Sequence, residues 1–160
     1  AKAHINAMRL ERARGLKGIA LFYEKKRQWV AAHTYYGQIN QALIIDVLND
    51  PDHETEAREL QSFANKRLSE ELFQWRVRDA LELYAEAQKA EKKNRPITAQ
   101  REYRKVKLNL EILPSDLERA ATATEIDLVR LQEIQSAVTA DLARIQQLLD
   151  ERELVRPTED

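Results

Sequence analysis

The residues that could carry out chemistry in this chain are few and widely spaced. Its three histidines are His4, His33 and His53, and no two of them stand three or four residues apart, as two metal ligands on one helix face would. The chain has no cysteine, so it offers no thiol nucleophile, no disulfide and no zinc–thiolate site. We therefore expect surface or packed histidines, no metal and no cofactor.

A group of glutamates is the second candidate for a site. Glu54, Glu56, Glu59, Glu70 and Glu71 could supply paired carboxylates on one helix face, but a di-metal helical bundle needs Glu-x-x-His pairs and the sequence contains none. Ion pairs with Lys and Arg at helical spacing account for these side chains. A glycine-rich phosphate loop is also missing, since it would need a preceding strand and a third glycine. We therefore predict a protein that is not an enzyme and has no catalytic residues.

Five residues are better suited to binding a partner than to catalysis. Trp29, Tyr35 and Tyr36 could stack on a ligand or a base, although packing at the first helix corner is the simpler interpretation. Arg101 and Arg104 stand on successive turns, and their planar guanidinium groups suit a partner that carries acidic groups. These five side chains form the candidate partner-binding set.

The composition predicts an all-α fold for the elements that position these residues. Gly occurs 3 times and Pro 4 times, too rarely for the many tight turns of a β protein of this length. We expect about five antiparallel helices in helix-turn-helix units, over residues 2–32 (with a break or close contact at Gly15 and Gly18), 38–49, 53–93, 97–113 and 115–154. Gly37 is expected at the first corner. One helical domain, 1–155, would precede a frayed C-terminal end, 156–160.

The last predicted helix has the clearest pattern. Ser115 and Glu118 form a capping box at its start. Its apolar seam follows steps of four and three residues: Leu117, Ala121, Thr124, Leu128, Leu131, Gln135, Val138, Leu142, Ile145 and Leu149. Gln135 either specifies the register or partner number of this seam, or lies at a helix crossing and faces water. An uncovered seam would lead to a homo-oligomer through this helix.

Charge is unevenly distributed along a chain whose formal net charge is −1. Residues 1–31 and 89–107 each carry a net charge of +6, and residues 108–160 carry −7. Internal pairing of basic and acidic helices is the favoured interpretation, ahead of a basic surface for an acidic partner or nucleic acid. No apolar run approaches the 18 residues of a membrane span, and the composition does not indicate a compartment.

Two stretches, 21–52 and 83–116, look alike as helix, corner, helix and proline. The second stretch has a small residue, a corner residue, another small residue, an aromatic residue and a proline. In this order they are Ala87, Asn94, Ala99, Tyr103 and Pro114. The first stretch has a shorter match of Gly37, Ala42 and Pro51. This pattern resembles the tetratricopeptide-like superfamily, although the two units stand about 60 residues apart where that family has 34. The resemblance implies an all-helical fold that binds a protein or peptide on a concave face, without chemistry.

A weaker resemblance concerns the last predicted helix. From Leu117-Glu118-Arg119 to Val155-Arg156-Pro157 it is similar to the returning arm of the helical hairpin in periplasmic adaptor (membrane-fusion) proteins, with 54–93 as the outgoing arm. That family implies a structural role in a transport or secretion assembly. We therefore expect a scaffold that binds another protein or peptide. The adaptor hairpin is the first alternative, and nucleic-acid binding through 1–31 and 89–107 is the least favoured.

Overall fold

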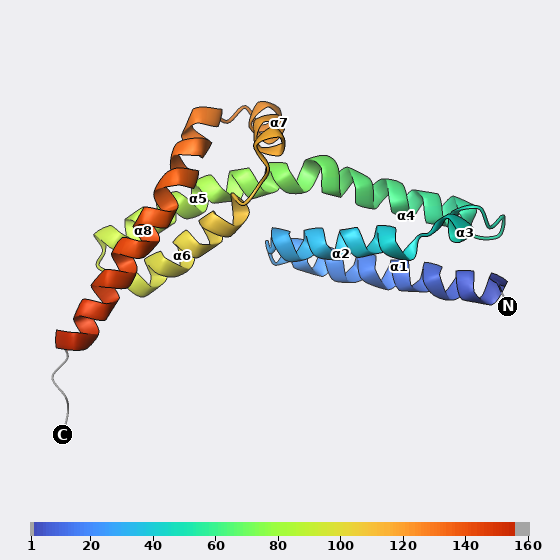
Figure 1. Ribbon diagram of the computed structural model, residues 1–160, viewed down its shortest axis with the longest axis horizontal. Helices are drawn as coiled ribbons and strands as arrows, with labels where there is room; N and C mark the ends of the chain where they lie inside the picture. Colours follow the sequence, from blue (N-terminus) through green and yellow to red (C-terminus); the bar gives the residue numbers. More distant parts are fainter. Residues whose placement is uncertain (1, 156–160) are drawn as a thin grey trace, which may run out of the picture. The chain divides into compact units, whose positions relative to one another are not determined.

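Seven helices follow one another along residues 2–155, which are the residues that this computed structural model describes (Figure 1). Their bounds are α1 Lys2–Lys25, α2 Trp29–Ala42, α3 Ile45–Leu48, the continuous run of α4 Glu54–Lys66, η1 Arg67–Glu71 and α5 Leu72–Lys92, then α6 Pro96–Asn109, α7 Pro114–Thr124 and α8 Leu128–Val155. No strand occurs in this range, so the all-α class is confirmed. The expected number of about five helices is too low.

The first corner lies at Arg27 and not at a glycine. Arg27 has φ 57°, and the Gln28 amide donates to the Tyr23 carbonyl at 2.9 Å, which closes α1 with a left-handed turn. The break expected at Gly15 and Gly18 is wrong, since α1 runs through both. A glycine costs a helix only about 1 kcal/mol relative to alanine, which packing along the rest of α1 outweighs.

The corner expected at Gly37 is also wrong, because this residue lies inside α2. The predicted helix 38–49 is instead divided between the end of α2 and the short α3. The boundary expected between the helices 38–49 and 53–93 is confirmed at Asn49-Asp50-Pro51-Asp52, and α4 begins at Glu54 just beyond it. Proline cannot continue a helix interior, which explains why this stop could be predicted.

The long helix expected over 53–93 is present, from Glu54 to Lys92, with a π-helical segment at its centre. This segment, η1, spans Arg67–Glu71. Because a π turn holds more residues than an α turn, it rotates the buried stripe around the helix axis. The change of the buried stripe from one side of this helix to another therefore has a local backbone cause.

The single last helix predicted over 115–154 is wrong, because Glu125 separates α7 from α8. Glu125 has φ 57°, and the amide of Ile126 donates to the Ala121 carbonyl at 3.0 Å. The Ser115 capping box is also wrong: Leu113 is the N-cap and no side chain caps this end. The predicted helix end at Arg156-Pro157 and the frayed end 156–160 lie outside the described residues.

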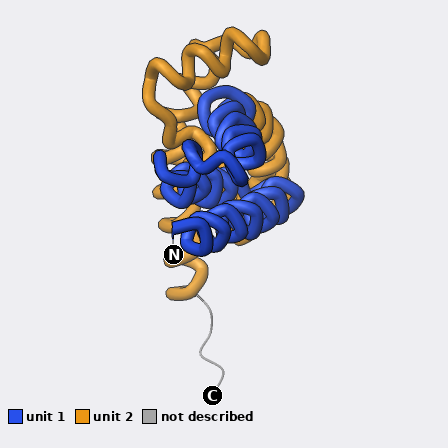
Figure 2. Tube along the Cα trace, turned by 90° about the vertical axis from the view of Figure 1, so that its right-hand side faces the viewer, with its two compact units in different colours: residues 1–73 blue, residues 74–160 orange. Residues whose placement is uncertain are grey.

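Two compact units make up the chain, residues 1–73 and 74–160, where we expected one helical domain over 1–155 (Figure 2). Each has its own core. Unit 1 buries one face each of α1, α2 and α4, with Leu10, Ala13, Ala20, Ala32, Tyr36, Ile39, Ala57 and Ala64. Unit 2 does the same with α5, α6 and α8, through Val77, Ala80, Tyr84, Ala87, Ala99, Tyr103, Val106, Leu131, Ile134 and Ile145.

The helix pairs α1–α2 and α5–α6 repeat each other with a shift of 67 residues. Asn94 has φ 58° at the second corner, as Arg27 has φ 57° at the first, and the Arg95 amide donates to the Ala90 carbonyl at 2.9 Å. The residue of the first helix pair that corresponds to Asn94 is therefore Arg27, and not Gly37 as the match through Gly37 and Ala42 implied. Buried alanines occupy equivalent positions before and after each corner, Ala20 and Ala32 in unit 1 and Ala87 and Ala99 in unit 2. Their small size lets the two helix axes approach.

Candidate partner-binding faces

Tyr36, one of the five candidate residues, lies in the core of unit 1. Its side chain is 0% exposed, and its hydroxyl donates to Glu24 Oε1 at 2.6 Å. Arg67 Nε lies 2.9 Å from the same carboxylate oxygen and joins α4–η1 to the α1–α2 pair. Burial and then the hydrogen bond to Glu24 raise the pKa of Tyr36. Tyr36 therefore packs inside unit 1 and does not lie on its surface.

Unit 2 contains the equivalent group of a tyrosine, a glutamate and an arginine, with a further tyrosine and an aspartate added to it. Tyr103 donates to Glu91 Oε1 at 2.6 Å, and Arg144 of α8 bonds the same oxygen. Arg144 also donates to Asp141 Oδ1 at 2.7 Å, and Tyr84 donates to Asp141 Oδ2 at 3.0 Å. Burial first, and then these carboxylates, raise the pKa of both tyrosines. The network joins α5, α6 and α8 and keeps the opposite face of α6 turned outward.

Trp29 and Tyr35 lie near the first corner of unit 1 and are partly exposed. The ring of Tyr35 stacks on Tyr23 with centroids 5.3 Å apart and planes 8° apart. Phe22 meets the Tyr23 ring edge to face at 5.5 Å and is itself exposed. Phe22, Tyr23 and Tyr35 thus form a small aromatic cluster at this corner. Contacts between these rings account for part of their placement.

Arg101 and Arg104 are exposed on the outer face of α6. Among the described residues, neither has a carboxylate within ion-pair distance, whereas the neighbouring Lys105 pairs with Glu102 at 3.5 Å. Ile97 and Leu108 continue the same stripe, because the spacing 97, 101, 104, 108 follows helical steps of four and three. These two side chains are 65% and 46% exposed. We call these four residues the α6 face.

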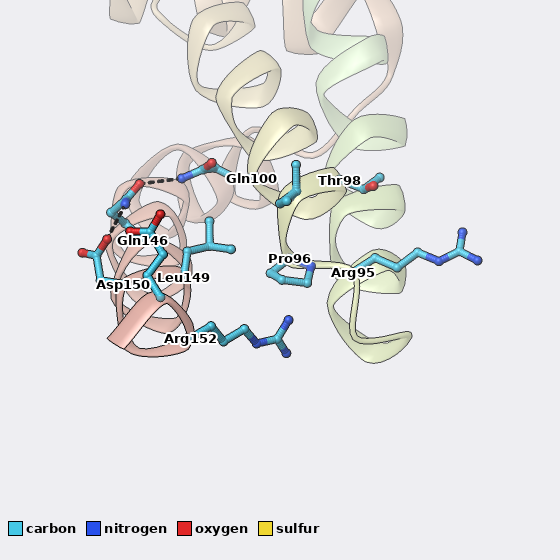
Figure 3. A pocket seen from close by; sticks show the side chains of 10 residues that line it. Arg95, Pro96, Thr98, Gln100, Gln146, Leu149, Asp150 and Arg152 are labelled. Atoms are coloured by element: carbon cyan, nitrogen blue, oxygen red, sulfur yellow. Dashed lines mark hydrogen bonds between the residues drawn. The ribbon is translucent and has the colours of Figure 1, made fainter. Parts of the chain in front are cut away.

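An open groove of about 810 Å³ adjoins the α6 face in unit 2 (Figure 3). The start of α6 forms one wall and the end of α8 the other, with Ile97 shared by the groove and the α6 face. Gln100 donates to Gln146 at 2.8 Å, which bridges the two walls at one side, and Gln146 donates to Asp150 within α8 at 2.9 Å (Figure 3). Apolar and charged side chains both line it, so the groove suits a peptide better than an apolar ligand.

Buried Arg76 fixes the other end of α6. Its guanidinium donates to the carbonyl oxygens of Leu108, Asn109 and Glu111, each at 3.0 Å. The last carbonyls of a helix lack some of the backbone donors of its interior, although the Leu108 carbonyl also accepts from the Glu111 amide at 3.3 Å. A cation at this end also interacts favourably with the helix dipole. Gln135 donates to the Leu110 carbonyl at 2.8 Å, so this seam residue binds the end of α6 in its own unit.

Trp29, Tyr35 and Tyr36 belong to unit 1, and Arg101 and Arg104 belong to unit 2. Arg101 and Arg104 share the exposed face of α6, whereas Tyr36 is buried and Trp29 and Tyr35 are partly exposed, so the three aromatic residues do not form one site. Our sequence analysis missed Ile97 and Leu108, although their spacing from the two arginines could have identified them. In unit 1, Ile19 and Phe22 of α1 are exposed although both are apolar.

Neither a metal centre nor a membrane span is found in the described part of the chain. No three residues of the types His, Cys, Asp and Glu within 2–155 lie close enough to hold a metal ion. None of the helices over the same residues is both long and apolar enough to cross a bilayer. Comparison of the chain with protein-family models, with curated proteins and with solved structures gives no match.

Proposed function

We propose that this chain is a non-enzymatic scaffold that binds a partner protein or peptide on the α6 face. The observation that carries this proposal is the pair of exposed arginines, Arg101 and Arg104, without a carboxylate partner among the described residues and between the exposed Ile97 and Leu108. Exposed arginines next to apolar side chains are typical of the side chains that contribute most to protein interfaces. An acidic partner would supply the carboxylates that these guanidinium groups lack.

A tetratricopeptide-like architecture is part of this proposal. In each helix pair a corner residue with positive φ is followed five residues later by a buried alanine and four residues further by a buried tyrosine. Arg27, Ala32 and Tyr36 have these positions in the first pair, and Asn94, Ala99 and Tyr103 in the second. This register supports the resemblance better than the one through Gly37 and Ala42.

The break between α7 and α8 weighs against the adaptor hairpin, whose returning arm would be one uninterrupted helix over 115–154. Nucleic-acid binding through 89–107 would leave Ile97 and Leu108 without a role, since phosphate contacts need only the cations. The α6 face, in which two cationic groups lie between two apolar ones, favours a protein partner.

The test begins with a photo-crosslinking residue at position 97 or 108 in cells that make this protein, followed by identification of what is captured. The captured protein is then purified and its binding to the full chain is measured by calorimetry. We expect Arg101→Glu with Arg104→Glu to weaken this binding about tenfold or more, because both guanidinium groups would be lost and reversed.

Arg78→Glu, at an exposed position of α5, is the matched control and should bind as the wild type does. Unchanged affinity after charge reversal at Arg101 and Arg104, with the chain still folded by circular dichroism, would overturn the proposal. Capture of nucleic acid, with affinity that falls steeply as salt rises, would favour the alternative.

A further inference from the structure

α1 has a second stripe on the face opposite to the one that unit 1 buries. The buried face holds Asn6, Leu10, Ala13, Leu16 and Ala20. The outer stripe follows alternating steps of three and four residues through Ile5, Met8, Arg12, Gly15, Ile19 and Phe22. This is the spacing of a coiled-coil seam, and at 1.5 Å per residue it runs for about 26 Å.

The four apolar side chains of this outer stripe are exposed. Met8 is 58% and Phe22 55% exposed, and Ile5 and Ile19 are more than one-third exposed. A single exposed apolar residue is ordinary, but four on one helix face, in two pairs on either side of Arg12 and Gly15, are a common feature of interaction surfaces. The outer stripe therefore lacks a partner among the described residues.

Two glycines on α1 have no packing role inside the described chain. Gly15 and Gly18 are exposed, and a Cβ atom added to either would have no neighbour within 4 Å. Alanine would favour the helix at both positions, so the fold of unit 1 does not require glycine there. Gly15 lies within the outer stripe, where a missing side chain allows the backbone of another helix to come close.

The charges along the outer stripe are mainly positive. Arg9 and Arg12 flank Met8, and neither has a carboxylate within ion-pair distance among the described residues. Lys26 Nζ lies 5.6 Å from the centre of the Phe22 ring at the far end. Glu24, by contrast, is turned inward to Tyr36, which leaves Glu11 as the one acid on the exposed surface of α1.

We propose that the outer stripe of α1 docks one amphipathic helix of a partner protein, with acidic residues along the edges of that helix's apolar face. The length and spacing of the stripe select a helix, the positive charge selects acidic edges, and Gly15 allows close approach. This face lies on unit 1 and is independent of the α6 face.

A lipid surface fits the outer stripe less well. The centre of the stripe is Arg12 followed by Gly15, so it offers a bilayer no apolar side chain there, and a glycine that destabilises the helix gains nothing from lipid. A second copy docked through the same stripe would bring Arg9, Arg12 and Lys26 of both copies together, at a cost from like charges.

The test uses a synthetic amphipathic helix of three heptads with Leu at positions a and d and Glu at positions e and g, labelled for fluorescence anisotropy. The full chain carries Arg101→Glu and Arg104→Glu, so that the α6 face makes no contribution. We expect saturable binding, and a loss of about tenfold or more when Lys replaces Glu in the peptide or when Ile19→Ser and Phe22→Ser are introduced. Ile45→Ser, a matched exposed residue on α3, should leave binding unchanged.

Glycine substitutions separate docking from folding. Gly15→Ala should raise the melting temperature and yet weaken peptide binding about tenfold, because the added methyl group keeps the helices apart. Gly37→Ala in the interior of α2 should also raise the melting temperature but leave binding unchanged. Equal binding of the Glu and Lys peptides, or an unchanged affinity in the Ile19→Ser, Phe22→Ser chain, would overturn the proposal. So would binding to phosphatidylglycerol vesicles without peptide binding, or self-association that Phe22→Ser abolishes.

Discussion

Tyr103 donates a hydrogen bond of 2.6 Å to Glu91, twelve residues before it, and Tyr36 donates one of the same length to Glu24 across the same number of residues. In both units an arginine from another helical segment pairs with the same glutamate oxygen, Arg144 of α8 with Glu91 and Arg67 of η1 with Glu24. The carboxylate therefore has a cationic donor on one side and a phenol on the other, inside a helix corner. This arrangement fixes the packing of three helical segments by one half-buried acceptor.

Removing the Tyr103 hydroxyl should destabilise unit 2. Tyr103→Phe keeps the ring but deletes a donor to a charged acceptor, so we expect the free energy of unfolding to fall by about 1.5–3 kcal/mol. Tyr36→Phe should do the same in unit 1. Urea denaturation followed by circular dichroism measures both. Tyr35→Phe is the control, because this half-buried residue stacks on Tyr23 through its ring, and it should change stability by less than about 0.5 kcal/mol.

Alkaline pH should unfold the protein through these same phenols. Burial raises the pKa of Tyr36 and Tyr103 above the usual value near about 10. Their neutral forms thus contribute stability that is complete below about pH 10 and is lost as the pH rises through the raised folded-state values. Near the usual tyrosine pKa the absorbance at 295 nm should rise equally in the wild type and in the Tyr36→Phe, Tyr103→Phe double variant.

At higher pH the wild type should gain more tyrosinate absorbance than the double variant, in which Tyr84 is the remaining tyrosine with a raised pKa. The wild type should lose helical circular dichroism in the same range. A larger absorbance rise in the wild type than in the double variant near the usual tyrosine pKa, while the helices remain intact, would contradict a raised pKa at these two positions.

The buried Arg76 should be essential for the end of α6. Arg76→Met fills much of the same volume but leaves the carbonyls of Leu108, Asn109 and Glu111 without their donor. We expect the free energy of unfolding, measured by urea denaturation, to fall by about 3 kcal/mol. Unsatisfied buried acceptors cost about 1–3 kcal/mol each, and water can reach some of these carbonyls. Arg78→Met removes an exposed arginine two residues later and should have little effect.

Glycine at the break between α7 and α8 should stabilise the chain. Glu125 adopts φ 57°, a conformation that costs a residue with a Cβ about 1 kcal/mol more than it costs glycine. Glu125→Gly should therefore raise the free energy of unfolding by about 0.5–1 kcal/mol. The same substitution at Glu118, an exposed residue inside α7, should lower it by about 1 kcal/mol, and equal effects at the two positions would contradict this account.

Part of the candidate site could be predicted from residue types alone. Arg101 and Arg104 are exposed on one helix, as their spacing suggested, because charged side chains at helical steps rarely enter a core. Tyr36 and Tyr35 are adjacent aromatic residues with opposite environments, one buried and one partly exposed. Only the packing of α4 against α1 and α2 decides which of the two rings is enclosed.

The helix ends also divide into those that the sequence predicts and those that packing decides. Proline at positions 51, 96 and 114 predicted a boundary correctly each time, because a residue without an amide proton limits the backbone whatever surrounds it. The turns at Arg27 and Glu125 could not be predicted, because these residues do not favour positive φ and take it up only where packing on both sides outweighs the local cost.

The sequence by itself determined the helical class and the long helix from Glu54 to Lys92, because composition and spacing act locally along the chain. Tertiary structure decided the register of the two repeated helix pairs and the partition into two units. It also decided which stripe of α1 is buried. Both stripes of α1 follow helical spacing, and only contact with α2 and α4 selects Leu10 and Ala20 over Met8 and Phe22 for the core.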